Sequence, residues 1–308
     1  MTINVTNILD AERLETFAKI IEDSPDYRVL RALRVVATAE PPREMFDDVS
    51  LLVLDVETTG LNYEASKIIE FAARPIVVDY TGAIIHIGAP IVFLEDPGAP
   101  LPAEIVALTG LSDGDLSGQR IDDEAVRHLF EKANFVVAHN AAFDRPFVEK
   151  RFPGLAPKPW ACSCHGIDWR AEGFEGKSLN ALLLQAGLFQ PNDAHRALSD
   201  VDTLVALLKS KLSGGRTIAD ILIETAQKPT MLIEATGSHI STKDVLRARG
   251  YGWASSRKVW SREVPLECRH PEEDWLAENV YAPSLNAKAN GPTIHEVTAL
   301  QRYSARLP

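Results

Sequence analysis

The feature that most constrains the fold is a series of short apolar runs between residues 50 and 94. LLVLDV, SKIIEFAARPIVVD and AIIHIGAPIVFLE follow one another, and the turn YTG separates the last two. Apolar runs of this length that end at turn residues are typical of buried strands. The sequence therefore predicts an antiparallel meander of three strands in this region.

Helical segments and one more strand follow the meander. NFVVAHN reads as a fourth buried strand, whereas the other segments have apolar residues at three- and four-residue spacing. The predicted helices are AEIVALTG, DDEAVRHLFEKA, AAFDRPFVEKRF, SLNALLLQAG and ALSDVDTLVALLKSKL. In the fourth of these, Ser178 suits the N-cap and Gly187 suits the stop. Strands followed by helices that flank a mixed sheet predict an α/β core over residues 48–212.

The segments on either side predict additions to this core. Residues 1–47 contain ERLETFAKIIEDS and YRVLRALRVVA, both with helical spacing, and predict an N-terminal helical extension. Residues 213–228 begin with SGGR and predict a linker followed by a helix. Residues 229–308 predict a small α+β accessory domain, with the strands TMLIEAT and KVWSREV around the helix TKDVLRARG. We expect its last forty residues to be irregular, with short helical pieces.

Charge and cysteine content limit the class of protein. The formal net charge of −11 argues against a protein that coats nucleic acid, but it does not exclude an enzyme that acts on nucleic acid. Three cysteines in 308 residues do not make a disulfide framework. The first residues have neither a basic nor an apolar leader pattern, and no apolar run approaches the ~20 residues that span a bilayer. We therefore expect a cytoplasmic protein without a membrane segment.

Two acidic residues lie at the end of the first apolar strand, where buried strands rarely carry charge. Asp55 and Glu57 are two residues apart, so on a strand their side chains emerge on the same face. Two anions this close repel and raise each other's pKa unless a cation joins them. The pattern Asp-x-Glu is weak alone, and a strand end that enters a solvated loop explains it equally well.

Further acids lie at the ends of other predicted elements. Asp144 falls in the first turns of the helix after NFVVAHN, and His195 precedes Asp200 by five residues. On one helix the last two side chains would diverge by about 140°, so we place His195 in the preceding loop and Asp200 on the helix. The nearby Asp202 is expected to face solvent.

Four converging carboxylates suit two hard divalent cations, Mg²⁺ or Mn²⁺, because such ions prefer oxygen ligands. Two ions of this kind can clamp the attacking and leaving oxygens of an in-line displacement at phosphorus. A histidine with an unperturbed pKa of about 6.5 suits the removal of a proton from the attacking water. The paired acids at the strand end are thus interpreted as part of a metal site.

Three stretches in this order, VLDVETTGL (53–61), HNAAFD (139–144) and HRALSD (195–200), resemble the motifs of the DEDDh exonucleases. This family includes the proofreading epsilon subunit of bacterial DNA polymerase III, ribonuclease T and oligoribonuclease. The resemblance implies a ribonuclease H-like fold, a mixed five-stranded sheet with helices on both faces. It also implies that Asp55, Glu57, Asp144 and Asp200 hold the two cations and that His195 is the general base.

The same resemblance implies which residues contact the substrate. These residues are Thr58, Thr59, Gly60, Leu61, His139, Asn140 and Phe143. The backbone of the first four would cradle the terminal nucleotide, with Leu61 pressed against the terminal bases. Taken singly, the residues leave simpler interpretations open: Leu61 and Phe143 as core residues, His139 as a local hydrogen-bonding group, and Asn140 as a helix cap.

The implied activity is metal-dependent 3′→5′ hydrolysis of nucleic acid to nucleoside 5′-monophosphates. DNA is the preferred substrate, with single strands or frayed 3′ ends favoured because the terminal base must reach the metals. One alternative keeps the chemistry and changes the polymer, to an exoribonuclease that trims RNA or degrades oligoribonucleotides. The other is a weakly catalytic nucleic-acid-binding module, which would not need a water-activating base.

Two other clusters in the sequence have competing interpretations. Cys162, Cys164 and His165 could suggest zinc, but a structural zinc site needs four ligands and no second cluster is near, so buried thiols are preferred. In the C-terminal region, basic and aromatic residues alternate: Lys243, Arg247, Arg249, Tyr251, Trp253, Arg257, Lys258, Trp260 and Arg262.

This alternation fits two interpretations, a single-strand-binding surface or a small tryptophan core surrounded by solvated cations. The whole-chain pattern, including TALQRYSAR near the end, resembles bacterial epsilon-like exonucleases. The tail does not resemble the polymerase-binding segment of a dedicated proofreader. A protein partner bound through the C-terminal domain is a further expectation.

Overall fold

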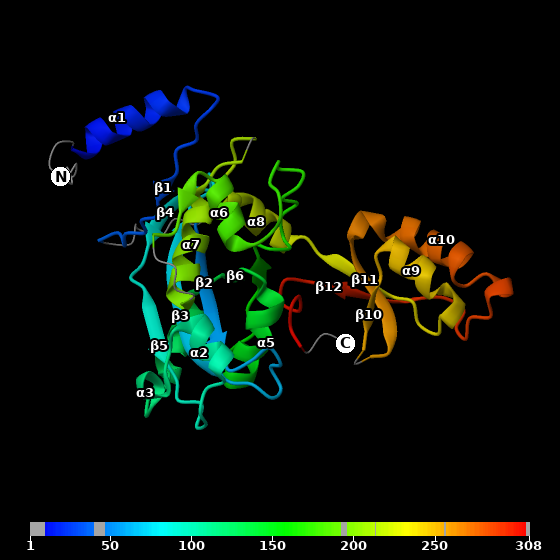
Figure 1. The fold of residues 1–308 in the computed structure, drawn as a ribbon. Helices are drawn as coiled ribbons and strands as arrows, with labels where there is room; N and C mark the ends of the chain where they lie inside the picture. The colour runs from blue at the N-terminus through cyan, green and yellow to red at the C-terminus, as the bar shows by residue number, and fades with distance from the viewer. Residues whose placement is uncertain (1–9, 40–46, 192–195, 213, 256, 306–308) are drawn as a thin grey trace.

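The main sheet of the molecule is mixed, with the strand order β4–β3–β2–β6–β7 (Figure 1). The computed structural model describes residues 10–39, 47–191, 196–212, 214–255 and 257–305. The strands are β2 Val49–Thr58, β3 Ile68–Val78, β4 Ile84–Ile87, β5 Ile91–Leu94, β6 Phe135–Ala138 and β7 Trp160–Cys162. β2, β3, β4 and β5 pair antiparallel, whereas β6 and β7 are parallel to β2. The predicted meander and fourth strand are confirmed.

The sheet has six strands in five positions. β2 pairs along one edge of β3, and β4 and β5 share the other edge one after the other. The third predicted apolar run is thus divided into two strands, since Gly88 to Pro90 interrupt the pairing. The mixed α/β architecture agrees with the predicted fold class.

Helices cover both faces of this sheet because successive side chains of β2 point to opposite faces. Leu51 and Val53 pack in one core cluster with residues of α7 and α8, and Leu52 and Leu54 pack in a second with residues of α4 and α5. The helices are α2 Ala103–Thr109, α3 Asp113–Leu116, α4 Asp123–Lys132, α5 Ala141–Arg151, α6 Leu179–Gln185, α7 Ala197–Lys209 and α8 Ile218–Gln227. Among the described residues, no helix has the length and apolar character needed to cross a bilayer.

The N-terminal region contains one of its two predicted helices. α1 spans Ala11–Glu22 and is capped by Asp10, but the helix predicted for YRVLRALRVVA is wrong. This segment is extended, and its strand β1, Arg31–Ala32, pairs parallel with β8, Leu188–Phe189. The side chain of Leu33 is buried against Leu183 and Ala206, a contact that the extended backbone permits and that local spacing does not reveal.

A second sheet forms what we call the C-terminal unit, residues 230–297. Its antiparallel strands have the order β10–β11–β9–β12, and α9 and α10 supply further core residues. The elements are β9 Thr230–Glu234, α9 Lys243–Arg249, β10 Gly252–Ala254, β11 Val259–Pro265, α10 Arg269–Asn279 and β12 Thr293–Val297. The helical pieces expected in the C-terminal end are present, α10 among them, whereas the expected irregularity is wrong for β12. β12 is stabilised as a strand by pairing with β9, which lies about sixty residues earlier in the chain.

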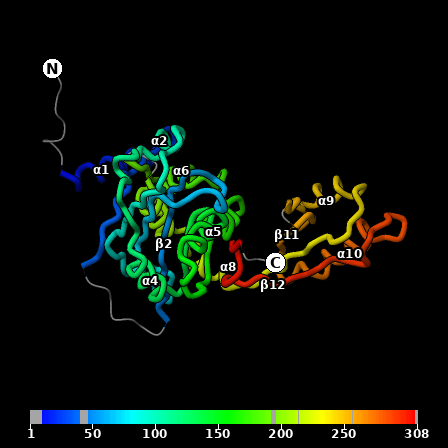
Figure 2. The backbone as a smooth tube through the Cα atoms, turned by 90° about the horizontal axis from the view of Figure 1, so that it is seen from below, coloured from blue at the N-terminus to red at the C-terminus, as the bar shows by residue number. Residues whose placement is uncertain are grey.

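After β12 the chain returns to the main sheet, and Figure 2 shows this red segment beside α5 and α8. We call residues 298–305 the return segment. The backbone N–H of Trp160 donates a hydrogen bond of 2.8 Å to the carbonyl of Ala299. Arg145 of α5, only 3% exposed, donates to the carbonyls of Ala299, Leu300 and Arg302 at 3.3, 2.6 and 2.7 Å. The return segment therefore fixes the C-terminal unit to the main sheet.

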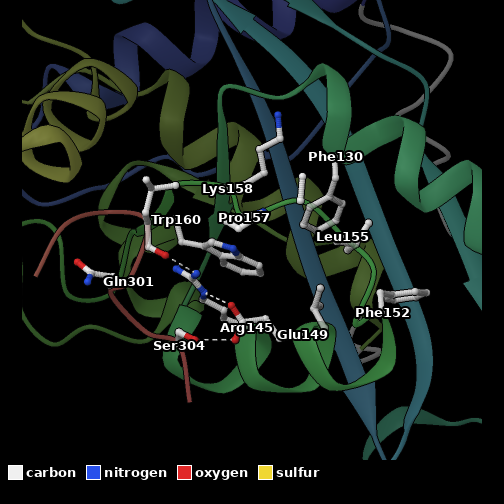
Figure 3. A pocket seen from close by; sticks show the side chains of 13 residues that line it. Phe130, Arg145, Glu149, Phe152, Leu155, Pro157, Lys158, Trp160, Gln301 and Ser304 are labelled. Carbon is white, nitrogen blue, oxygen red and sulfur yellow. Dashed lines mark hydrogen bonds and ion pairs between the residues drawn. The ribbon is translucent and has the colours of Figure 1, made fainter. Parts of the chain in front are cut away.

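A cavity of about 240 Å³ lies between α5, the loop before β7 and the return segment (Figure 3). Arg145 and Trp160 line it, with the guanidinium 5.7 Å from the ring centroid. Ser304 also lines it and donates to Glu149 at 2.7 Å. The predicted site acids do not line this cavity, so it is separate from the candidate active site.

Replacement of Arg145 by methionine is predicted to release the return segment. The change leaves carbonyl groups without their buried donor and Glu149 without its ion-pair partner, so we expect a loss of about 3 kcal/mol in the free energy of unfolding. Limited proteolysis followed by mass spectrometry should reveal new cleavage within residues 298–305. Arg127→Met, which removes an exposed ion pair on α4, is the control. An unchanged cleavage pattern for Arg145→Met would contradict the assignment.

Candidate active site

Three carboxylates converge at the end of β2. Asp55 and Glu57 emerge on one face of this strand, and Asp200 approaches from the first turn of α7. One oxygen from each carboxylate lies within 4.8 Å of the others, and all three residues are half-buried. Two of the acids come from alternate positions on a strand and the third from a helix that crosses that strand. Three carboxylates at this spacing are suitable ligands for one divalent cation.

The fourth predicted acid, Asp144, lies beneath this cluster in the first turn of α5. It is 1% exposed, and its Oδ1 accepts a hydrogen bond of 3.2 Å from the backbone N–H of Val56, between the two acids of β2. Within the described part of the chain, its Oδ2 has no hydrogen-bond partner. A buried carboxylate oxygen without a donor is costly unless a cation or water satisfies it.

Burial and mutual repulsion raise the pKa values of these acids. Burial raises the pKa of Asp55 well above its ordinary value, and the charges of Asp144, Asp200 and Glu57 raise it further. Burial, followed by the charges of Asp200 and Glu70, raises the pKa of Glu57 to about 8. The pKa of Asp144 is also raised to about 8, mainly by burial. The cluster therefore has an excess of negative charge that divalent cations would neutralise.

The predicted base cannot be placed in the same way. His195 lies outside the described residues, and the description resumes at Arg196, the N-cap residue of α7. Asp200 lies on the helix, as expected from the argument about their spacing. The position of His195 thus stays a prediction.

A functional residue that the sequence reasoning missed is Glu70 on β3. It lies opposite Glu57 in the strand pairing and is 1% exposed. Its carboxylate accepts hydrogen bonds from Nη2 and Nε of Arg196 at 2.8 and 3.0 Å and from the backbone N–H of Ala197 at 3.2 Å. Glu70 therefore holds the start of α7, the helix that carries Asp200. A charged residue within the apolar run IIEFAARPIVV was the signal available in the sequence.

Hydrogen bonds within the loop after β2 stabilise its conformation. The buried hydroxyl of Thr58 donates to the carbonyl of Gly60 at 2.8 Å, and the backbone N–H of Thr59 donates to the carbonyl of Lys67 at 2.9 Å. A Cβ on Gly60 would come within 2.9 Å of the hydroxyl of Ser66, so a larger residue here would require that side chain to move. Leu61 is 88% exposed at the tip of this loop, and its interpretation as a core residue is wrong.

The other predicted substrate residues surround the start of α5. Nδ1 of His139 is 2.8 Å from the hydroxyl of Ser163, its Nε2 is 2.8 Å from the carbonyl of Lys177, and burial lowers its pKa. Asn140 is the N-cap residue with a left-handed φ of 72°, but its side chain makes no capping hydrogen bond. Phe143 is half-buried against Phe147, with ring centroids 5.0 Å apart.

Comparison with known proteins identifies the family. The RNase_T family model, described as Exonuclease, matches residues 52–208, just over half of the chain, and this range contains every acid of the cluster. The chain belongs to this exonuclease family. Its mixed sheet with helices on both faces is the fold expected from the resemblance of the three motifs.

Individual relatives match this exonuclease over part of their length. The chain is 38% identical over 107 residues to a DNA polymerase III PolC-type protein of Halalkalibacterium halodurans, which is 34% of this chain and 7% of that protein. It is 32% identical over 200 residues to a DNA polymerase III subunit epsilon-like protein of Rhodobacter capsulatus, which is 61% and 27% of the two chains. The chain therefore spans less than a third of the length of these relatives.

Among solved structures, the exonuclease is similar to exonuclease X in complex with 5′ overhanging duplex DNA. The sequences are 27% identical, and the match covers 56% of this chain and 99% of that chain with a TM-score of 0.39.

The structure also tests the expectations for Asp202 and for the two cysteines of the sequence WACSCHGIDW. The prediction that Asp202 faces solvent is wrong, because its carboxylate accepts a hydrogen bond of 2.8 Å from the buried Arg74 and is itself largely buried. The Cys162 thiol is buried at the end of β7 and Cys164 is half-buried, in agreement with the expected buried thiols. Among the described residues, the only cluster with metal-ligand spacing is the one formed by Asp55, Glu57 and Asp200.

The stability of the metal-free exonuclease is predicted to fall as the pH rises from about 4 to about 8. In the unfolded chain Glu57 and Asp144 have pKa values near 4, whereas in the folded protein both lie at about 8. Between these values the folded state binds more protons than the unfolded state, so rising pH favours unfolding. Saturating Mg²⁺ or Mn²⁺ should reverse most of this loss, because the cation binds the ionised carboxylates.

Thermal unfolding with a chelator and with added cation, measured across this pH range, tests the prediction. The increase in Tm caused by the cation should be larger at about pH 8 than at about pH 5. Equal increases at both pH values would show that these carboxylates do not bind the cation.

Proposed function

We propose that this exonuclease removes nucleotides one at a time from the 3′ end of a nucleic acid and releases nucleoside 5′-monophosphates. The observation that carries the proposal is the convergence of Asp55, Glu57 and Asp200 near the buried Asp144, whose Oδ2 has no hydrogen-bond partner among the described residues. These four acids occur in the order of the DEDDh motifs within the exonuclease match. The 3′→5′ direction and the two-cation mechanism are supported by that motif order.

Each proposed role follows from the position of the residue. Asp55, Glu57 and Asp200 would hold one divalent cation, Mg²⁺ or Mn²⁺, and Asp144 would support a second. Such cations supply charge stabilisation at the attacking and leaving oxygens of phosphoryl transfer. His195 would accept the proton of the attacking water, which its place in the HRALSD motif supports.

The loop after β2 would position the terminal nucleotide. Its internal hydrogen bonds hold Thr58, Thr59 and Gly60, and Leu61 projects from it with 88% of its surface exposed. An exposed leucine beside a charged cluster would pack against the terminal base rather than against the protein core. His139, Asn140 and Phe143 would line the other side, since they flank Asp144 at the start of α5.

DNA is the proposed substrate, as single strands or frayed 3′ ends. The names of the PolC-type and epsilon-like relatives, both DNA polymerase III proteins, support DNA over RNA.

We further propose residues 48–212 as the catalytic domain, 1–47 as an extension, 213–228 as a linker with a helix and 229–308 as an accessory domain. The separate core cluster of the C-terminal unit supports an accessory domain, whereas α8 and Ala299 share a core cluster with the proposed catalytic domain. A cytoplasmic location and a protein partner on the accessory domain complete the proposal.

The test uses 5′-labelled single-stranded DNA, recessed duplex DNA and RNA of equal sequence, each with Mg²⁺ or Mn²⁺. A ladder that shortens from the 3′ end, absent for Asp55→Ala, is the expected result. Faster cleavage of RNA than of DNA would favour the exoribonuclease alternative, because the 2′-OH distinguishes the two polymers. If no substrate were cleaved and metal titration gave no heat, the weakly catalytic binding module would be the better description.

A further inference from the structure

The C-terminal unit uses most of its arginines internally. Arg249 and Arg262 both pair with the carboxylate of Glu272, which is 3% exposed, at 2.9 and 3.3 Å. Arg257 pairs with Glu234 at 3.0 Å. These three cations hold elements of the unit together, so they are neither solvated charges nor ready phosphate contacts.

The aromatic residues of the unit divide into a buried and an exposed group. Tyr251 is 3% exposed and belongs to the core, and Trp260 packs against that core from β11. Trp253 lies opposite Trp260 in the strand pairing, with ring centroids 5.6 Å apart and an angle of 62° between the ring planes. Yet Trp253 is 52% exposed on β10, the edge strand of the sheet. A small tryptophan core accounts for Trp260 but not for the exposed ring of Trp253.

Cations lie on the two elements next to this pair of rings, α9 and the β10–β11 turn. The guanidinium of Arg247 lies 5.6 Å from the ring centroid of Trp260, and its side chain is 67% exposed. Lys243 lies one turn earlier on the same helix, and Lys258 lies in the turn between β10 and β11. Within the described residues, neither lysine is in an ion pair, whereas Arg247 pairs with the exposed Asp244 at 3.3 Å. Lys243, Arg247 and Lys258 thus bring three cations and Asp244 one acid to these elements, on a chain whose net charge is −11.

We propose that this surface, formed by Trp253, Trp260, Lys243, Arg247 and Lys258, binds single-stranded nucleic acid. We call it the Trp253 surface. A base would stack on the exposed ring of Trp253, and the cations would contact neighbouring phosphates. An exposed aromatic ring flanked by cations fits a strand that offers a flat apolar base and a negative phosphate at each step. This complementarity of charge and shape is the reason for proposing single-stranded nucleic acid as the ligand.

This inference rests on the proposed function, because the strand bound at the Trp253 surface would be the substrate strand whose 3′ end enters the active site. The C-terminal unit stands on the side of the main sheet where α5 lies (Figures 1 and 2), and α5 carries Asp144. The return segment, held by Arg145, keeps the unit in that position. Binding at a second, attached site raises the effective concentration of the strand at the first.

Binding is tested with the full-length protein and a fluorescent single-stranded oligomer of about 20 nucleotides, in the presence of a chelator so that no hydrolysis occurs. Trp253→Ala should weaken binding about tenfold through the loss of one stacked base. Lys243→Gln with Lys258→Gln should reduce the slope of log affinity against log salt by about 1.4, because each phosphate contact on a single strand contributes about 0.7. Tyr80→Ala, which removes an 81% exposed ring from the turn after β3, should change neither quantity.

Hydrolysis with Mg²⁺ separates this inference from the proposed function. Trp253→Ala should degrade a dinucleotide at the wild-type rate and the long oligomer several-fold more slowly at limiting concentration. If Trp253→Ala binds and degrades the long oligomer as the wild type does, the inference is overturned while the nuclease activity stands. If the wild type binds the oligomer through Trp253 but cleaves neither substrate, the proposed function fails and the binding surface stands.

Discussion

Asp55→Asn is expected to lower the rate of hydrolysis about a thousandfold or more and to raise the Tm of the metal-free protein. The carboxylate lies among Glu57, Asp144 and Asp200, so its removal takes away a proposed metal ligand and relieves repulsion at the same time. Single-turnover hydrolysis of 5′-labelled DNA and thermal unfolding in a chelator measure the two effects. Opposite signs for activity and stability are the signature of an acid retained for function.

The matched control for this substitution is Asp26→Asn, which alters an exposed acid in the N-terminal region. It should leave both the hydrolysis rate and the Tm near the wild-type values. A lower Tm for metal-free Asp55→Asn would mean that the carboxylate of Asp55 stabilises the metal-free fold. Wild-type activity in this variant would show that Asp55 is not a metal ligand.

Arg196→Met is expected to destabilise the protein by about 3 kcal/mol and to slow hydrolysis. The change leaves the carboxylate of Glu70 buried without its cation, and this carboxylate faces Glu57 across the strand pair. The start of α7 would then lose its anchor, so the position of Asp200 would change. Urea unfolding gives the stability, and kcat measured at saturating oligomer gives the effect on chemistry.

The double variant Glu70→Gln with Arg196→Met separates charge from packing. Replacement of both partners removes the unpaired charge, so most of the lost stability should return, and the amide oxygen can still accept from the N–H of Ala197. Arg216→Met, which removes an exposed ion pair with Asp220 of α8, is the control and should cost less than about 1 kcal/mol. If the double variant were as unstable as Arg196→Met, the carboxylate of Glu70 would not be the source of the effect.

Local patterns explain why much of the fold could be predicted. The apolar runs of β2 and β3 and the spacing in α4, α5 and α7 reflect burial of one or both faces of each element, which a sequence displays directly. The motifs that contain Asp55, Asp144 and Asp200 were likewise visible, because each motif is a local pattern at the end of one element. The family match over residues 52–208 agrees with that interpretation.

The errors have a common physical cause. The segment at Arg31–Ala32 has helical spacing, yet it is extended because Leu33 is buried against Leu183 and Ala206. β12 is a strand because it pairs with the edge of β9, and Asp202 is largely buried because it pairs with Arg74 of β3. Each outcome depends on a partner far away in the chain, and no local pattern records that partner.

By itself, the sequence determined the α/β architecture, the exonuclease family and the acids assigned to the metal site, because these depend on periodicity and on short motifs. Only the tertiary structure decided that Glu70 and Arg196 anchor α7 and that Arg145 holds the return segment. It also decided which C-terminal cations form internal ion pairs and that Trp253 stays exposed. Compensation of buried charge is a property of neighbours in space, so it becomes visible only once the strands and helices are packed.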